Sequence, residues 1–448
     1  MSESKGSGLP GLTSALKNKL IQQTLERKLR QAGQTHERAP LVGQKKGAVP
    51  EAFTRFDQYP GYRQLRIMND GAARLGVRSP FFKLHEGTAG ADTSIGGRSY
   101  VNFASYNYLG MSGDPVVTQA AKDAIDRYGT SVSASRLVSG ERPIHRELES
   151  ALAELYGVDD AITFVSGHAA NVTTIGYLFG PRDLVVHDEL IHNSVLQGIQ
   201  LAGAKRLSFA HNDADALDAL LLEQRHQFER VLIVVEGIYS MDGDFPDLPR
   251  LVDIKRRHQA FLMVDEAHSL GVMGKTGRGI REHFGMSGDA VDIWMGTLSK
   301  TLAGCGGYIA GETALIEHLK FLAPGFLYSV GMPPPVAAAS LAALKRMLEL
   351  PERVETLQAR GKYFLERAKA AGIDTGTSAG IAVVPAILGS SLRATRWSGL
   401  LFEEGFNVQP ILYPAVPEQS ARLRFFIACT HGEREIDEVI ASMQRMPR

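Results

Sequence analysis

The sequence is poor in cysteine and has no long apolar run. Its 448 residues include two cysteines, Cys305 and Cys429, and neither belongs to a CxxC pair. A disulfide framework is therefore excluded, and we expect a reducing, cytoplasmic location. No apolar stretch reaches the ~18 residues that a membrane span needs, and the polar N-terminus lacks the apolar run of a signal peptide. We therefore expect a soluble protein.

The sequence also has no excess of either charge. Lys and Arg number 49, Asp and Glu number 49, and the formal net charge is zero. Nothing global favours nucleic acid or an acidic polymer as a partner, so we expect no nucleic-acid binding. The length and the 44% hydrophobic content predict a large core and more than one domain, because single cores stop growing near ~250–300 residues. This is a globular protein of enzyme size.

Residues 1–48 differ from the rest, because they hold nine Lys/Arg against three Asp/Glu. We predict a basic appendage with one amphipathic helix followed by a linker. The helix could pack on its own protein or be partly disordered, dock to a carrier protein or larger assembly, or lie on a membrane surface. The leucines at helical spacing are Leu12, Leu16, Leu20, Leu25 and Leu29.

After a segment at 49–100, short apolar runs alternate with amphipathic stretches, which predicts a parallel sheet covered by helices on both faces. We assign residues 101–335 to this large α/β domain and 336–448 to a smaller α+β domain. The triple proline at 333–335 would open one long helical region. The predicted strands are 161–165, 183–188, 230–237, 260–268, 292–296 and 306–311 in the first domain, and 381–388, 406–412 and 421–428 in the second.

Polar residues follow several predicted strands, where ligands collect in open parallel sheets. A buried Asp265 needs a partner, which could be a protonated ring nitrogen, a metal or an arginine, and His268 follows three residues later. The turn at Gly167 could hold a phosphate or be an ordinary strand-to-helix turn. His192 and Ser240 follow two further strands. No cluster offers three ligands at a zinc spacing, so no metal site is predicted.

Lys300 lies in the stretch "GTLSKTLAGCGG", among apolar, hydroxylic and glycine residues. Such surroundings would lower its pKa and make the neutral amine available for Schiff-base chemistry. A lone lysine near glycines is more often part of a surface loop. Taken together, however, a phosphate turn, a ring-stacking histidine, a strand-end aspartate and a hydroxyl-x-x-Lys from Thr297 to Lys300 describe a pyridoxal phosphate site.

Eight motifs in order make the stretch from about residue 98 to 435 resemble the α-oxoamine synthases. These are pyridoxal phosphate enzymes of aspartate-aminotransferase fold (fold type I), and they include serine palmitoyltransferase, 5-aminolevulinate synthase, 8-amino-7-oxononanoate synthase and 2-amino-3-ketobutyrate CoA ligase. "ASYNYLG" and "VEGIYSMDG" are most similar to the serine palmitoyltransferase branch. The motifs are "NFASYNYLG", "YGTSVSASRLVSG", "HDELIHNSVLQG", "VEGIYSMDGDFPDLP", "MVDEAHSLGVMGKTGRG", "GTLSKTLAGCGGYIAG", "YSVGMPPP" and "ARLRFFIACTH".

The resemblance implies a role for each matching residue. Lys300 would form the imine with the cofactor and later transfer protons, and Asp265 would pair with the pyridine nitrogen. His192 would stack on the ring, and His268 would bond its O3′ oxygen. The residues near the ring or its phosphate would be Thr297, Gly167, His168 and Ser240, with Ser329 reaching the neighbouring subunit's phosphate.

The resemblance also bears on substrates. Arg424 matches the family's residue for the substrate carboxylate. Tyr106 and Asn107 would lie at the substrate, but Tyr106 stands where several relatives have Asn, as in the serine palmitoyltransferase pattern, so this pair does not settle which amino acid is used. His168 replaces a Phe or Tyr of these enzymes, which leaves only its backbone in a firm role. Sites shared between subunits imply a homodimer.

The implied reaction is decarboxylative condensation of serine, glycine or alanine with a long or polyketide-derived acyl thioester of CoA or a carrier protein. Another pyridoxal phosphate reaction on the same fold, transamination or aldol cleavage, is the first alternative. A non-catalytic partner subunit is the second, although such a subunit would be expected to lack Lys300.

Overall fold

The computed structural model describes residues 49–74 and 79–447 of the chain. Contacts divide the chain into two compact units, residues 1–82 and 83–448. The predicted basic helix and its docking role fall in residues 1–48, outside the described residues. The described part of the first unit holds the short 3₁₀ helices η1 (Glu51–Phe53) and η2 (Phe56–Gln58) and the helix α2 (Pro60–Arg74).

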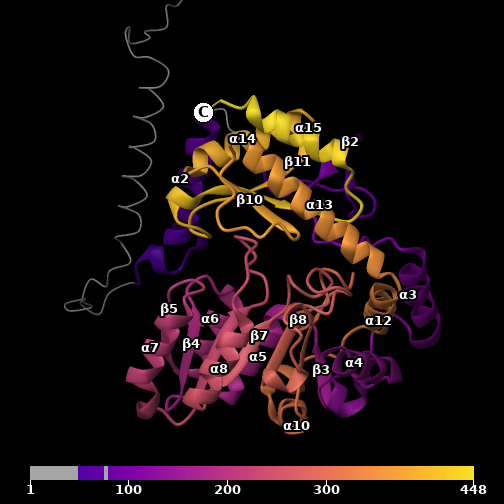
Figure 1. Ribbon diagram of the computed structural model, residues 1–448, viewed down its shortest axis with the longest axis vertical. Coiled ribbons are helices and arrows are strands. Elements are labelled where there is room, and N and C mark those ends of the chain that lie inside the picture. Colours follow the sequence, from indigo (N-terminus) through magenta and orange to yellow (C-terminus); the bar gives the residue numbers. More distant parts are fainter. Residues whose placement is uncertain (1–48, 75–78, 448) are drawn as a thin grey trace, which may run out of the picture. The chain divides into compact units, whose positions relative to one another are not determined.

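The second unit contains a seven-stranded sheet, which lies in the lower half of the view in Figure 1. Its strands are β3 (Asp160–Phe164), β4 (Leu184–Asp188), β5 (Lys205–Phe209), β6 (Val231–Glu236), β7 (Phe261–Asp265), β8 (Ile293–Thr297) and β9 (Gly307–Gly311). The order across the sheet is β3-β9-β8-β7-β6-β4-β5. The four pairs from β5 to β8 are parallel, whereas β9 is antiparallel to both neighbours, β3 and β8.

Helices cover both faces of this sheet, so its inner strands, such as β4 and β6, are buried on both sides. In β6, for example, Val234 packs into one apolar cluster and Val235 into another, because successive side chains of a strand point to opposite faces. One cluster includes residues of α3 (Pro115–Tyr128), α4 (Pro143–Tyr156), α7 (Ala214–Gln224), α8 (Leu248–His258) and α12 (Pro334–Glu349). The other includes residues of α5 (Gly167–Leu178), α6 (Asn193–Ala202), α10 (Thr313–Leu322) and α11 (Pro324–Leu327).

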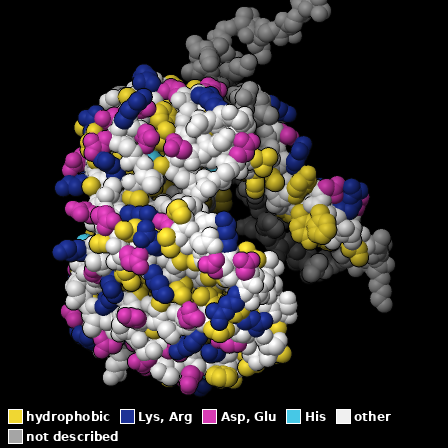
Figure 2. All heavy atoms as spheres, turned by 90° about the vertical axis from the view of Figure 1, so that its right-hand side faces the viewer, with side chains coloured by type: hydrophobic (Ala, Val, Ile, Leu, Met, Phe, Trp, Pro, Cys, Tyr) yellow, Lys and Arg dark blue, Asp and Glu magenta, His cyan; other side chains and the backbone are white. Residues whose placement is uncertain are grey.

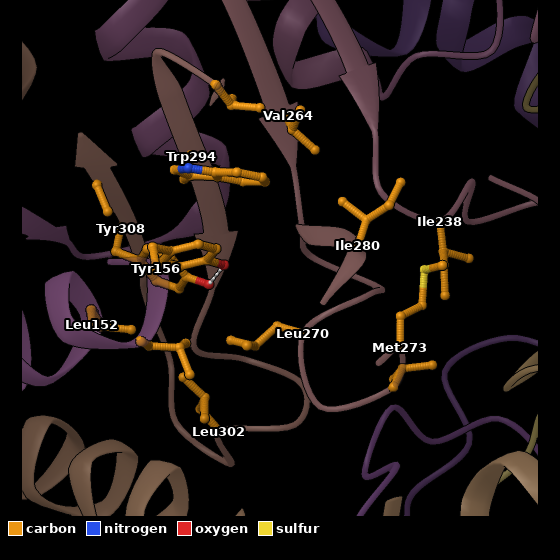
Figure 3. Close-up of a cluster of buried hydrophobic side chains, with 14 of the residues drawn as sticks. Leu152, Tyr156, Ile238, Val264, Leu270, Met273, Ile280, Trp294, Leu302 and Tyr308 are labelled. Carbon is orange, nitrogen blue, oxygen red and sulfur yellow. Dashed lines mark hydrogen bonds between the residues drawn. The ribbon is translucent and has the colours of Figure 1, made fainter. Parts of the chain in front are cut away.

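Aromatic side chains hold part of the first cluster together (Figure 3). The hydroxyl groups of Tyr156 and Tyr308 lie 2.7 Å apart, and the ring of Tyr156 stacks on Trp294 with 5.1 Å between centroids. All three side chains are fully buried, and the two tyrosine hydroxyls are hydrogen-bond partners of each other. This packing joins α4 to the strands β8 and β9.

The predicted large, parallel-rich sheet with helices on both faces is confirmed, with two differences. The sheet is not wholly parallel, because 306–311 forms the antiparallel strand β9. The polar run at 205–209 forms the edge strand β5, which the apolar-run criterion missed because an edge strand has one partner and much of it is exposed.

Two three-stranded sheets lie outside the large sheet, with orders β1-β2-β11 and β10-β13-β12, and the first of them joins residues 92–102 to the C-terminal part. Their strands are β1 (Asp92–Ile95), β2 (Arg98–Asn102), β10 (Val383–Ile387), β11 (Phe406–Asn407), β12 (Gln409–Ile411) and β13 (Arg422–Phe426). The single strand predicted at 406–412 was therefore wrong. Its first half pairs parallel with β2 and its second half antiparallel with β13.

The single long helical region predicted after residue 330 is two helices. α12 ends at Glu349 and α13 (Pro351–Ala370) begins at Pro351, which has no N–H to continue the first helix and disfavours helical geometry at Leu350. The domain division at 335/336 stays a prediction. The remaining elements are α9 (Ile280–His283), α14 (Ser391–Glu403), α15 (Glu433–Gln444), a π-helix η3 (Arg136–Gly140), and 3₁₀ helices η4 (Arg225–Gln227), η5 (Gly288–Ala290) and η6 (Glu418–Ser420).

Basic and acidic side chains are interspersed on the face shown in Figure 2, with no area of one sign. None of the helices in the described ranges is long and apolar enough to span a lipid bilayer.

Candidate active site

The strand directions bring the predicted site residues to one edge of the large sheet. β4, β6, β7 and β8 are parallel, and β3 runs the same way because β9 is antiparallel to both β3 and β8. The carboxyl ends of five strands therefore meet. The residues that follow these ends are Gly167, His192, Ser240, His268 and Lys300.

The turn after β3 is a close-packed helix start. Ser166 caps α5 by accepting a hydrogen bond from the Ala169 N–H at 2.9 Å. A Cβ on Gly307 would lie 2.5 Å from the Gly167 Cα, and one on Gly167 would lie 3.1 Å from the Thr297 Oγ1. Only glycines allow this approach. It places the Thr297 side chain beside the N-terminus of α5, where the free N–H groups and the helix dipole favour an anion.

Asp265 ends β7 and is 4% exposed. Its Oδ2 accepts a hydrogen bond from the Asn171 Nδ2 at 3.0 Å, and its Oδ1 accepts one from the Ala267 N–H at 3.0 Å. Two donors from different elements hold the carboxylate in one orientation. The buried negative charge is therefore positioned as well as stabilised.

His192 caps α6 and is linked to Asp265 through two buried side chains. Its Nδ1 lies 2.7 Å from the Ser194 Oγ, and the Ser194 Oγ accepts a hydrogen bond from the Asn171 Nδ2 at 2.9 Å. Desolvation lowers the pKa of His192, Asp265 opposes this, and the Lys300 cation lowers the pKa further. His192 is therefore neutral at neutral pH.

His268 lies on the far side of Asp265 and contacts two tyrosines. Its Nδ1 is 2.8 Å from the Tyr108 hydroxyl, and its ring is perpendicular to that of Tyr106, with 6.1 Å between centroids. Burial lowers the pKa of His268 well below its usual range, and the positive charges of Lys300 and Arg424 act in the same direction. A neutral imidazole can donate one hydrogen bond to a ligand while Tyr108 fixes its other nitrogen.

Lys300 lies beneath Tyr106, with its Nζ 5.6 Å from the centroid of the ring. Burial lowers the pKa of Lys300 to about 8, although the nearby Asp265 carboxylate favours the charged form. A substantial fraction of the amine is thus neutral near physiological pH, and the neutral amine is the nucleophile.

Glu236 is a buried acid at the site that the sequence analysis did not select. It ends β6, pairs in register with Asp265 of β7, and is 3% exposed. Burial and the neighbouring Asp265 carboxylate raise the pKa of Glu236 well above its usual range. Glu236 therefore holds its proton more tightly than an exposed glutamate does, whereas Asp265 has two N–H donors that stabilise a carboxylate.

We expect Glu236→Gln to flatten the pH dependence of stability. The unfolded chain releases the Glu236 proton near pH 4.5 and the folded chain holds it to higher pH, so this group makes unfolding easier as pH rises above 4.5. The glutamine variant should gain stability relative to wild type between pH 5 and pH 8. Thermal unfolding at several pH values measures this, with the exposed Glu223→Gln as a control. If the difference in unfolding temperature between variant and wild type is the same at every pH in this range, the pKa of Glu236 is not raised in the folded protein.

Arg422 and Arg424 both lie on β13 but have different partners. Arg422 forms an ion pair with Asp242 at 2.5 Å. Arg424 donates to the Ser240 carbonyl at 3.1 Å, and it forms no ion pair with any residue in the described ranges. Burial lowers the pKa of Arg424, but a guanidinium stays charged at neutral pH. Arg424 is thus a cation that is available to an anionic ligand. Ser240 contacts it through the backbone carbonyl and not through the side chain.

A histidine bridge fixes the loop that carries Ser240. His211 Nδ1 lies 2.9 Å from Asp188 at the end of β4, and its Nε2 lies 2.9 Å from Asp244. Desolvation opposes protonation, but the two carboxylates outweigh it and raise the pKa of His211 to about 10. Thr377 also donates to Asp244 at 2.5 Å, so the loop is held to β4 and to the C-terminal part.

Three predicted residues stand apart from this cluster. The side-chain amide of Asn107 binds backbone groups: its Nδ2 donates to the Ala89 and Ser112 carbonyls at 2.8 and 3.1 Å. His168 is exposed at the start of α5, and its role at a phosphate stays a prediction. Ser329 donates to the Val330 carbonyl at 3.3 Å and contacts none of the cluster. Its predicted role toward a second subunit stays a prediction.

A cavity of 380 Å³ opens beside Lys300. Among the described residues that line this cavity, Lys300 is the only lysine or arginine and His85 is the only histidine. The lining is His85, Ala89, Asn102, Ala104, Ser105, Tyr106, Asn107, Ser112, Ser299, Lys300, Ala303, Gly304 and Gln409.

The sequence analysis missed four residues of the site: Tyr108, Asn171, Ser194 and Glu236. Three of them fall within motifs already quoted, "NFASYNYLG", "HDELIHNSVLQG" and "VEGIYSMDGDFPDLP". The signal that could have found Glu236 is an acid directly after a continuous apolar strand run, the same signal that identified Asp265. Asn171 carries no such signal, because its partners come from other elements.

Comparison with known proteins gives a family and close relatives. A family model described as aminotransferase class I and II matches residues 98–443. The 8-amino-7-oxononanoate synthase of Fervidobacterium nodosum is 41% identical over 364 residues, which cover 81% of this chain and 92% of that protein. The corresponding enzyme of Symbiobacterium thermophilum is 41% identical over 354 residues, covering 79% and 90%.

Solved structures show the same fold. The Sphingomonas wittichii serine palmitoyltransferase matches with a TM-score of 0.82 at 28% identity, covering 86% of this chain and 96% of that chain. An 8-amino-7-oxononanoate synthase from Francisella tularensis matches with a TM-score of 0.68 at 26% identity, covering 77% and 97%. The chain therefore belongs to the aminotransferase class I and II family and, within it, to the α-oxoamine synthases, pyridoxal-phosphate-dependent acyltransferases of fold type I that condense an amino acid with an acyl thioester and release CO2.

Proposed function

We propose that this α-oxoamine synthase joins a small amino acid to an uncharged acyl thioester. The amino acid's α-carbon forms a bond to the acyl carbonyl carbon, the thioester C–S bond breaks, and thiol and CO2 leave an α-amino ketone. The observation that supports this most directly is the meeting of three groups at one sheet edge: the lowered-pKa amine of Lys300, the buried carboxylate of Asp265 and the unpaired cation of Arg424.

The residues fit pyridoxal phosphate. The helix start at Gly167-His168, with the Thr297 hydroxyl beside it, would hold the phosphate, since a side chain on Gly167 would fill this place. Asp265 would face the ring nitrogen, and Lys300 would attach the cofactor through its amine. His192 and His268 would lie against the ring and its hydroxyl oxygen. Ser240 would lie near the ring.

Bound pyridoxal phosphate supplies an electron-withdrawing ring that stabilises negative charge on the amino acid's α-carbon. The chain's residues do the rest. Arg424 binds the substrate carboxylate, and its charge needs such a partner in a buried place. Lys300 accepts and returns the proton at the α-carbon, for which a pKa of about 8 is suited near neutral pH. Asp265 keeps the ring nitrogen protonated.

The cavity favours an uncharged acyl chain. The 8-amino-7-oxononanoate synthases are named for a product that ends in a carboxylate. In this chain the cavity lining, within the described ranges, has no arginine and no lysine besides Lys300 to pair with such a carboxylate. A distal carboxylate would lose its hydration without a partner, so a neutral chain is favoured.

The space beside Lys300 favours a small amino acid. The Tyr106 ring lies over the Lys300 Nζ and contacts Phe426 edge-on, with 4.7 Å between centroids. Because Tyr106 and Phe426 fill this space, glycine, alanine and serine fit best. The contacts do not favour one of the three.

A homodimer is part of this proposal. The apolar side chains on either side of Ser329 in the chain are exposed: Tyr328 by 88% and Val330 by 50%. Such side chains close together are typical of a surface that a partner covers, and the partner proposed is a second copy of this chain. Docking of an acyl carrier protein through residues 1–48, and a cytoplasmic location, for which the two free cysteines argue, also stay proposals.

The test is to incubate the pyridoxal-phosphate-loaded enzyme with each small amino acid and a series of acyl thioesters. We expect free thiol and CO2 in equal amounts with a neutral acyl chain, and at least about tenfold lower kcat/KM with a chain of equal length that ends in a carboxylate. Equal rates with both chains would contradict the uncharged-chain proposal.

Two outcomes would favour the other functions. Transfer of the amino group to a keto acid, or cleavage of a β-hydroxy amino acid, without thiol release would indicate an aminotransferase or an aldolase. Absence of cofactor uptake would indicate a non-catalytic partner subunit.

A further inference from the structure

Asn171 makes two hydrogen bonds that fix its own orientation. Its side chain is 1% exposed, and its Nδ2 donates to the Asp265 Oδ2 at 3.0 Å and to the Ser194 Oγ at 2.9 Å. The opposite amide orientation would place the Oδ1 against a carboxylate oxygen, which is repulsive. Both hydrogens of the amide group are therefore used, one for each partner.

The direction of these bonds determines what Ser194 can do. Its hydroxyl has one hydrogen, and its oxygen accepts from Asn171, so the hydrogen is available to the nitrogen 2.7 Å away, the Nδ1 of His192. The Ser194 backbone N–H points at the same nitrogen from 3.3 Å. Two donors face the Nδ1, which must therefore be an acceptor without a proton.

A neutral imidazole whose Nδ1 has no proton has its proton on Nε2. We propose that Asn171 and Ser194 are positioning residues that hold His192 in the Nε2–H tautomer and join it to Asp265, so that His192 offers a substrate oxygen a hydrogen-bond donor and not a base. This proposal rests on the proposed function only in that a substrate binds beside His192. The tautomer follows from the fold itself.

The charged groups around His192 agree with a neutral ring. Two acids face His192: Asp265, which is hydrogen-bonded to Asn171, and Glu236, which accepts from the His192 backbone and whose raised pKa favours its neutral form. Burial, Lys300, His168 and Arg424 all disfavour a second proton on the ring. A donor from Ser194 to Nδ1 stabilises the neutral ring in the same way. Loss of that donor should therefore move the titration of His192 to higher pH.

The experiment is nuclear magnetic resonance on the full-length chain labelled with ¹⁵N histidine, with and without added pyridoxal phosphate. His192→Asn identifies the signals of His192 by removing them. In the wild-type chain we expect a protonated Nε2 and an unprotonated Nδ1 at neutral pH in both samples. In Ser194→Ala we expect the ratio of the two tautomers to shift toward Nδ1–H by about tenfold, and the titration to move to higher pH.

Two further variants separate positioning from general damage. Ser194→Thr keeps the hydroxyl and should restore the wild-type tautomer, and Gln197→Ala, on the exposed face of α6, should leave it unchanged. A wild-type His192 with its proton on Nδ1, or a Ser194→Ala spectrum and titration identical to wild type, would overturn the proposal. Because the spectrum is also read without cofactor, this result is independent of whether the condensation reaction is found.

Discussion

Lys300→Ala should abolish covalent attachment of pyridoxal phosphate and reduce kcat by about 10³-fold or more, because one side chain provides both the attachment and the proton transfer. Reduction of the loaded enzyme with borohydride makes the attachment permanent, and mass spectrometry of the digested protein then locates it. We expect the cofactor on Lys300 in the wild type and on no lysine in the variant.

The matched control is Lys275→Ala, which removes the same side chain at an exposed position after β7. It should keep the attachment and the activity of the wild type. The rate of attachment should rise with pH and level off above about 8, where burial leaves the Lys300 amine neutral. Attachment at another lysine in Lys300→Ala, or an attachment rate that does not change between pH 6 and pH 9, would contradict the assignment.

Much of the site could be predicted from the sequence because it follows strand ends. Asp265 and Lys300 each come after a short apolar run, and parallel strands bring their ends to one edge, so chain position translates directly into spatial position. The order of the motifs along the chain indicated the same arrangement of strand ends. The large sheet was predictable for the same reason, since strands buried on both faces have continuous apolar sequences.

The parts that could not be predicted depend on contacts between distant residues. Asn171 matters because Asp265 and Ser194 lie beside it, and nothing in its local sequence indicates either contact. The division of 406–412 between two sheets depends on its pairing with β2, which is about 300 residues earlier in the chain, and with β13. Tertiary packing decides such features, and local propensity does not specify them.

Glu236 shows a different limit. Its position at a strand end could be read from the sequence, but its protonation could not, because this depends on its burial and on the register that sets it against Asp265. Two carboxyl groups at adjacent strand ends disfavour a second negative charge in the site. Asp265 is the better place for a single charge, because Asn171 and Ala267 donate hydrogen bonds to it.

That single charge is the reason to expect a large effect from Asp265→Asn. The variant offers one oxygen and one amide nitrogen to two donors, the Asn171 Nδ2 and the Ala267 N–H, so one donor loses its acceptor. An amide also cannot hold a proton on the ring nitrogen of the cofactor. We expect kcat to fall by about 10³-fold while Lys300 still attaches the cofactor.

The measurement is kcat together with the borohydride assay, so that lost attachment and lost chemistry are told apart. Asp289→Asn, the same change at an exposed position in η5, should leave both unchanged. A cofactor methylated on its ring nitrogen carries a permanent positive charge, and in Asp265→Ala, where the side chain is removed and space is left, it should recover part of the lost rate. If this analogue recovers nothing while it is attached normally, Asp265 acts by holding Asn171 and the histidine joined to it; recovery by the analogue assigns the effect to the charge on the ring.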